Sequence, residues 1–245
     1  MNKFYNIYNV LVIGLISLIL SGCQQAINTN NTLNNTSNDR GIGTQWGDGV
    51  ESHVREVKLA RINNTPIDVA VIHYSKKAFV HGKKVQELML NGDVGMSIID
   101  DNNNKWSLFK QDDEINMSGE AGKNYQLYYV NYSRNTYEIV ATVDGLDVIN
   151  GKAGSLNNNG YILRPYSTLS IKGFRKNERE VASFTFSQAS KAYANHTDEG
   201  SANNIGVIGT AIFQLENSNQ YKKSPNSNAF PADSYNSKYA KPPRY

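Results

Sequence analysis

The residues Tyr-Glu-Ile-Val-Ala-Thr-Val, 137–143, show most clearly what kind of structure this chain forms. Apolar residues occupy every second position, and the polar residues Glu138 and Thr142 lie between them. Because successive side chains of a β-strand point to opposite faces, this alternation predicts a strand with one face buried and the other in water.

The same alternation occurs at residues 67–71 and 182–186, and shorter runs rich in Val, Ile, Tyr, Phe and Thr extend from about residue 51 to 216. Short turns of Asn, Asp and Gly favour antiparallel pairing, because a parallel crossover needs about a dozen residues or more. The sequence therefore predicts an all-β fold, an antiparallel β-sandwich over residues 51–216, with one short helix at about 188–194. We expect roughly ten strands, drawn from about 54–62, 66–74, 78–81, 84–90, 95–99, 105–109, 125–132, 137–144, 161–164, 168–175, 180–186 and 206–215.

Length and composition fit one sizeable folded domain. The chain has 245 residues, of which 39% are hydrophobic and 19% are charged, which argues against a wholly disordered chain and against a membrane protein with many spans. The 25 basic and 22 acidic residues are too evenly balanced to indicate a nucleic-acid partner. The Gly- and Asp-rich segment 111–123 leaves one alternative open, in which it links two smaller β-units.

The N-terminus carries an export signal. An apolar run extends from Val10 to Leu20 and ends in Leu20-Ser21-Gly22-Cys23. This run is shorter than the roughly 20 residues that span a bilayer, so residues 1–22 are predicted to be a signal peptide.

Leu20-Ser21-Gly22-Cys23 resembles the lipobox of bacterial lipoproteins. The resemblance implies cleavage between Gly22 and Cys23, a diacylglycerol thioether on the Cys23 sulfur and acylation of the new N-terminus. Cys23 would then hold the protein on the membrane of a bacterial cell envelope, and Gln24, which is not acidic, favours the outer membrane over the inner under that family's sorting rule. An ordinary secretory signal and a buried cysteine are the alternatives.

Polar segments flank the predicted body. Residues 23–50 are predicted to be the lipidated cysteine and a flexible tether, since they are rich in Asn, Thr, Ser and Gln. Residues 217–245 are predicted to be a disordered basic tail that contains Tyr and Pro. Its Lys and Arg residues suit an anionic lipid or wall polymer, and a solvated terminus without a role is the alternative.

Trp46, Arg164 and Arg175 are the candidate binding residues. Trp46 lies between glycines in the stretch 43–52, and the two arginines lie in a second stretch that runs from 143–148 through 160–165 to 171–175 and closes with 206–209. These stretches resemble an uncharacterised family of proteobacterial envelope proteins, and that resemblance implies no activity. Trp and Arg are common anchors of binding surfaces, so the three residues are a hypothetical recognition patch, with packing and turn formation as the alternative.

No catalytic residue, metal site or cofactor is predicted. Serine never occurs as Gly-x-Ser-x-Gly, and the only cysteine is assigned to the anchor. The loop 100–104 has oxygen donors at alternate positions but lacks the glycine and glutamate of an EF-hand, which leaves only a looser calcium site with Asp112, Asp113 or Glu114. The four histidines show no pair at metal-ligand spacing: His53, His73, His81 and His196.

Two hypotheses of function follow from the sequence. The first is a non-catalytic, lipid-anchored envelope protein that binds an envelope protein or a surface polymer. The second is an envelope hydrolase or glycan-processing enzyme with two carboxylates from separate loops, about 5–10 Å apart in a cleft, at least one of which has a perturbed pKa.

Overall fold

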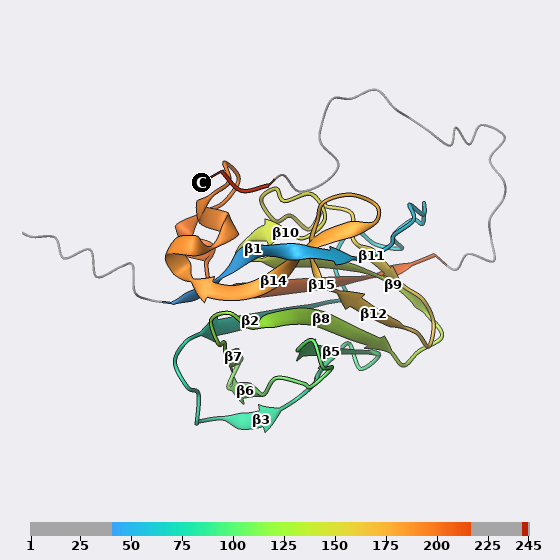
Figure 1. The fold of residues 1–245 in the computed structure, drawn as a ribbon. Helices are drawn as coiled ribbons and strands as arrows, with labels where there is room; N and C mark the ends of the chain where they lie inside the picture. The colour runs from blue at the N-terminus through green and yellow to red at the C-terminus, as the bar shows by residue number, and fades with distance from the viewer. Residues whose placement is uncertain (1–40, 217–241, 245) are drawn as a thin grey trace, which may run out of the picture. The chain divides into compact units, whose positions relative to one another are not determined.

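The structure is a computed structural model that describes residues 41–216 and 242–244. In this part of the chain two β-sheets pack face to face, which confirms the all-β sandwich (Figure 1). Residues 1–40, including Cys23, and residues 217–241 lie outside the described residues. Within the described residues, no helix is long and apolar enough to cross a membrane.

The first sheet contains the N-terminal strand of the body and strands from the middle and the end of the chain. Two short strands, β12 and β13, follow one another and pair with β8 and β14, respectively. The order is β1 (Ile42–Glu51), β14 (Glu180–Gln188), β8 (Asn124–Asn131), β5 (Val94–Ile99) and β4 (Leu88–Leu90), with β12 (Thr168–Ile171) and β13 (Gly173–Arg175) off this path.

The second sheet has β15, the last strand described, near its centre between β9 and β2. The order is β10 (Leu146–Asp147), β9 (Thr136–Val143), β15 (Val207–Leu215), β2 (Asp68–Ser75), β7 (Glu114–Ser118), β6 (Leu108–Gln111) and β3 (Lys83–Val85), with β11 (Tyr161–Leu163) paired to β9.

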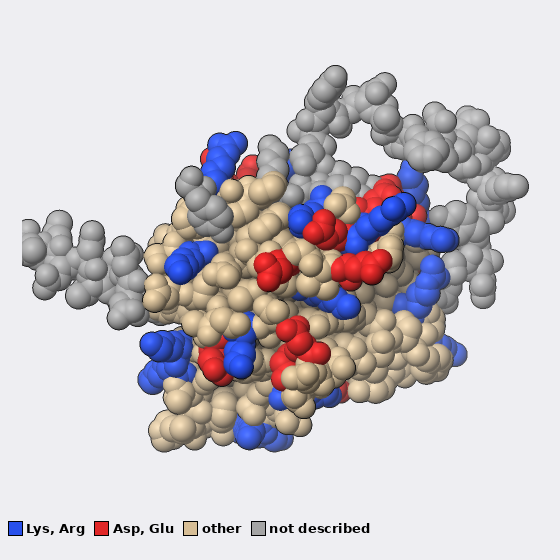
Figure 2. Space-filling model, in the orientation of Figure 1, with Lys and Arg blue, Asp and Glu red and all other residues tan. Residues whose placement is uncertain are grey.

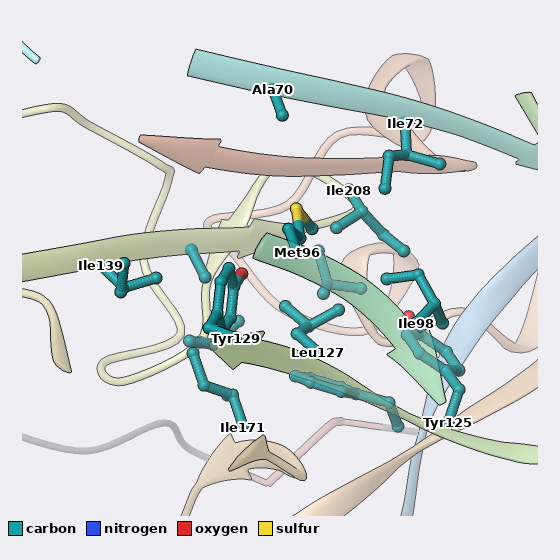
Figure 3. Close-up of a cluster of buried hydrophobic side chains, with 14 of the residues drawn as sticks. Ala70, Ile72, Met96, Ile98, Tyr125, Leu127, Tyr129, Ile139, Ile171 and Ile208 are labelled. Atoms are coloured by element: carbon teal, nitrogen blue, oxygen red, sulfur yellow. The ribbon is translucent and has the colours of Figure 1, made fainter. Parts of the chain in front are cut away.

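The core lies between the two sheets, where alternate side chains of facing strands meet (Figure 3). Met96 and Leu127 come from the first sheet, and Ile72 and Ile208 from the second, and all four side chains are fully buried. Burial of such side chains contributes about 1.5–3 kcal/mol each relative to leaving them in water. The alternation in the sequence is thus explained by the inward faces of the strands.

The outer face of β9 differs from the prediction. Glu138 was expected to face water, but it is buried, and so is Val140, which lies on the same face of the strand. Val140 packs with Ala211 and Phe213 in a second, smaller cluster. The guanidinium carbon of Arg61 lies 3.6 Å from the centre of the Phe213 ring, and Arg61 Nε donates to Glu138 Oε2 at 2.5 Å. An ion pair and β11 therefore cover a face that the alternation alone assigns to solvent.

Several predicted boundaries are wrong. The tether was predicted to run to residue 50, but β1 begins at Ile42, because this Gly-rich segment pairs with β14 along most of its length. The predicted strands at 54–62 and 78–81 are absent, and residues 52–66 make only one isolated bridge, from Arg61 to Leu215.

The segment 111–123, which one alternative takes as a linker, contains a strand, and the helix predicted at about 188–194 is absent. The segment contains β7, which pairs with β6 through a tight turn at Asp112 and with β2 on its other side. The pairing of β7 with β2 is parallel, because the hairpins from β3 to β6 are inserted between them in the chain. In place of the helix at 188–194 there are two 3-10 turns, η2 (Ala189–Lys191) and η3 (Tyr193–Asn195), separated by Ala192 in an extended conformation. A third, η4 (Ala202–Asn204), precedes β15.

Candidate functional site

Trp46 packs against the core. Its ring lies parallel to that of Phe174, with centroids 6.2 Å apart, and is tilted against Tyr193 at 4.8 Å. The side chain is half-buried on β1, at the edge of the first sheet. Aromatic pairs at these separations contribute about 0.5–1.5 kcal/mol beyond the area they bury, so Trp46 has a clear packing role.

Arg175 is buried, with 2% of its surface exposed. Its Nη2 donates to Ser52 Oγ at 2.9 Å, and its Nε donates to the Tyr161 hydroxyl at 3.2 Å. Nη1 donates to the carbonyl oxygens of Ser52 and Asn177. All these partners are uncharged, so a buried positive charge joins the end of β1, strand β11 and the turn between β13 and β14.

Arg164 is exposed in the turn before β12. Its carbonyl oxygen accepts from Asn131 Nδ2 at 2.9 Å and from Ser167 Oγ at 2.8 Å, so its backbone holds the turn. The three predicted binding residues do not form one exposed patch, because Trp46 is half-buried and Arg175 is enclosed. Cys23 lies outside the described residues.

An open groove lies where β1 ends. Beyond Glu51 the chain continues alongside the turn that joins β13 to β14: Ser52 N donates to Arg179 O at 2.8 Å, and Val54 N donates to Glu178 O at 3.0 Å. The groove has a volume of about 430 Å³ and is lined by His53, Val54, Arg55, Glu178 and Arg179. Two backbone segments that are hydrogen-bonded to each other therefore frame the groove.

The groove carries more positive than negative charge. Arg55, Arg179 and Glu178 are all exposed, and the structure gives neither arginine side chain an ion pair among the described residues. His53 Nε2 lies 3.5 Å from Glu51 Oε1, just outside the groove lining. Figure 2 shows basic and acidic side chains gathered at the end of the body where residues 52–66 begin. Guanidinium groups bind carboxylates and phosphates through paired hydrogen bonds, so this groove suits an anionic group.

A buried acidic network joins the two sheets at another place. Asp144 is 1% exposed, and its carboxylate accepts from the Tyr74 hydroxyl at 2.6 Å, from Thr44 N at 2.8 Å and from Gly206 N at 2.8 Å. Thr44 Oγ1 in turn lies 2.6 Å from the hydroxyl of Tyr125 on β8. Burial raises the pKa of Asp144 to about 6, although these hydrogen bonds favour the charged form.

Asp147 is also 1% exposed, and its burial raises its pKa. Its Oδ1 accepts from the backbone N–H groups of Ile149 and Asn150, both at 2.9 Å, and so holds the turn after β10. Asp144 and Asp147 are the carboxylates with raised pKa among the described residues, and neither lines the groove. The cleft with a perturbed acid that the hydrolase hypothesis requires is not formed by these two residues.

The loop 100–104 uses its oxygen donors internally. Asp100 Oδ1 accepts from Asn102 N and Asn104 N, both at 2.8 Å, and hydrogen bonds from Asn104 lower the pKa of Asp100. Among the described residues, no group of three or more His, Cys, Asp and Glu side chains could hold a metal ion.

The groove residues were missed at the sequence level. Residues 51–56 and 176–180 are both rich in charge, which is the only signal that marks them. Their meeting depends on the hydrogen bond between Val54 and Glu178, which are 124 positions apart, and no local pattern reveals that register.

The fold and the groove together define a β-sandwich with a cationic groove at one end. Comparison of the chain with family models, with curated proteins and with solved structures found no match.

Proposed function

We propose that this protein is a lipid-anchored protein of the bacterial cell envelope whose β-sandwich is a non-catalytic binding module. The lipid on Cys23 would hold it on the membrane, and the outer membrane is favoured by Gln24. Two or three acyl chains anchor a protein stably, since each buried CH₂ contributes about 0.8 kcal/mol. An envelope protein or a surface polymer would be the partner.

The groove beyond β1 is the observation that carries the binding role. Arg55 and Arg179 lie exposed on a hydrogen-bonded frame, with no ion pair among the described residues. The hydrogen-bonded backbone fixes the positions from which the two arginine side chains extend, and their guanidinium groups match the planar geometry of a carboxylate or phosphate. By contrast, Asp144 and Asp147 are fully engaged in holding the sandwich together.

The anchor is tested by Cys23→Ser in the full chain, expressed in the native host with radiolabelled palmitate. We expect the wild-type chain to take up label and to sediment with outer-membrane fragments. The variant should remain as unprocessed precursor without label, because no thiol accepts the lipid. Ser21→Ala is the matched control, since the thiol is retained. A Cys23→Ser chain that matures normally and stays on the membrane would refute the anchor.

The binding role is tested by chemical crosslinking of the protein in intact cells, followed by capture and identification of the crosslinked material. One envelope protein or polymer should be recovered with the wild-type chain and depleted with Arg55→Glu/Arg179→Glu. Turnover of an envelope glycan by the purified chain would contradict a non-catalytic role.

A further inference from the structure

We infer that the groove beyond β1 binds a phosphate or carboxylate group carried by an anionic envelope polymer, with Arg55 and Arg179 as the two contacts. This inference rests on the proposed function and names the ligand class of the same site. It is carried by the geometry of the frame, by the balance of charge and by the position of the groove on the body.

The frame holds the two arginines in place. Val54 N and Glu178 O are joined at 3.0 Å, so Arg55 and Arg179 each lie next to a residue of the same hydrogen-bonded pair. The buried guanidinium of Arg175 fixes both sides from within, because it donates to the carbonyl oxygens of Ser52 and Asn177. The backbone of the groove is therefore ordered before a ligand binds, and only the two arginine side chains lose freedom on binding.

Among the residues that line the groove, the charges favour an anion. Arg55 and Arg179 outnumber Glu178, the one carboxylate in the lining. Lys176 Nζ and Glu180 Oε1 form an ion pair at 2.6 Å beside the groove and so offset one another. The Arg175 guanidinium has only uncharged hydrogen-bond partners, and one of them, Ser52, is the residue before His53 of the lining.

Size and position favour a polymer segment. A volume of about 430 Å³ lies at the lower end of the range for small-ligand sites, which suits one substituted sugar rather than a folded partner. The ten residues of β1 separate the groove from Gly41, where the predicted tether joins the body, by about 30 Å (Figure 1). If Cys23 is anchored, the groove is therefore at the end of the body remote from the tether attachment.

The inference is tested by isothermal titration of the full chain in nonionic detergent. Three probes distinguish the source of the anion: a phosphate-bearing envelope glycan, the same glycan after dephosphorylation, and peptidoglycan fragments that bear carboxylates. We expect the wild-type chain to bind at least one charged probe, more weakly as salt is added. Arg55→Ala and Arg179→Ala should each weaken binding about tenfold, because each loses a charge-assisted hydrogen bond.

Arg134→Ala is the matched control, since Arg134 is exposed in the turn between β8 and β9 and the change removes the same charge. It should leave both the affinity and the melting temperature unchanged, and the groove variants should melt with the wild-type chain. Equal affinity of the wild-type chain and an Arg55→Ala/Arg179→Ala double variant would overturn the groove assignment while leaving envelope binding intact. A wild-type chain that binds none of the probes, but is captured with an envelope protein, would overturn the ligand class alone.

Discussion

Replacing Asp144 by asparagine tests whether a buried carboxylate between the two sheets makes the stability of this protein depend on pH. Asparagine has nearly the same shape and cannot ionise. Burial raises the pKa of Asp144 in the folded protein to about 6, from the ordinary value of 3.8 that applies to the unfolded chain. The folded state therefore binds the Asp144 proton more tightly than the unfolded state does.

The sign and size of the effect follow from this difference. Each pKa unit corresponds to about 1.4 kcal/mol, so protonation of Asp144 contributes about 3 kcal/mol of stability. That contribution is fully present below pH 3.8 and is lost as the pH rises through about 6. Other groups titrate in the same range, but they are common to both chains and cancel in the difference between wild-type and variant.

The assay is urea unfolding followed by tryptophan fluorescence between about pH 3.5 and pH 7.5, with the linear dependence of the unfolding free energy on urea. Asp144→Asn also places an amide opposite Thr44 N or Gly206 N, which costs about 1–3 kcal/mol at every pH. The expected result is that the wild-type chain gains about 3 kcal/mol over the variant as the pH falls through this range. Parallel stability curves would refute the reasoning, because Asp144 would then titrate alike in the folded and unfolded states.

Three further substitutions test the arginines. Arg61→Ala should lower the free energy of unfolding by about 3–5 kcal/mol in chemical denaturation, because it leaves Glu138 buried without its ion partner and uncovers Phe213. A loss below about 1 kcal/mol would place this pair among ordinary surface ion pairs. Arg175→Lys keeps the charge but loses the planar fork, and we expect a loss of about 1–3 kcal/mol together with weaker anion binding in titration. If a folded Arg175→Lys chain bound the anion with unchanged affinity, Arg175 would have no role in anion binding by the groove. Arg164→Ala should change neither the stability nor the anion affinity. A tenfold loss of anion affinity would instead support the recognition patch that the sequence predicts, of which Arg164 is a member.

The strands with strong alternation could be predicted from the sequence, and those that depend on distant partners could not. Residues 137–143 and 182–186 carry apolar side chains on the face that meets the core. The alternation that predicts each of these strands therefore lies within the strand's own sequence. The strand β1 contains three glycines and Asp48, which are weak β-formers, and it is extended because it pairs with β14, with Thr44 opposite Phe186, more than a hundred positions away. Residues 54–62 show the converse, since their apolar residues form no strand and the segment touches β15 only at its end, where Ile62 N donates to Gln214 O.

The candidate site was less accessible to sequence reasoning than the fold. Arg175 was singled out by residue type, and it lies next to the groove, but its guanidinium serves the frame from inside. Arg55 and Arg179 were not singled out, because an exposed arginine in a charge-rich run is common. Only the pairing of residues 52–54 with the turn at 178–179 gives these two side chains a shared position.

The central place of β15 in the second sheet governs when the protein can fold. Ribosomal synthesis delivers the N-terminus first, yet β2 and β9 obtain their shared neighbour only when residues 207–215 arrive. Until then both strands have unsatisfied edges and half the sandwich is open. A nascent chain of this kind exposes apolar surface until nearly all of it is available, and such surface promotes aggregation when it stays uncovered.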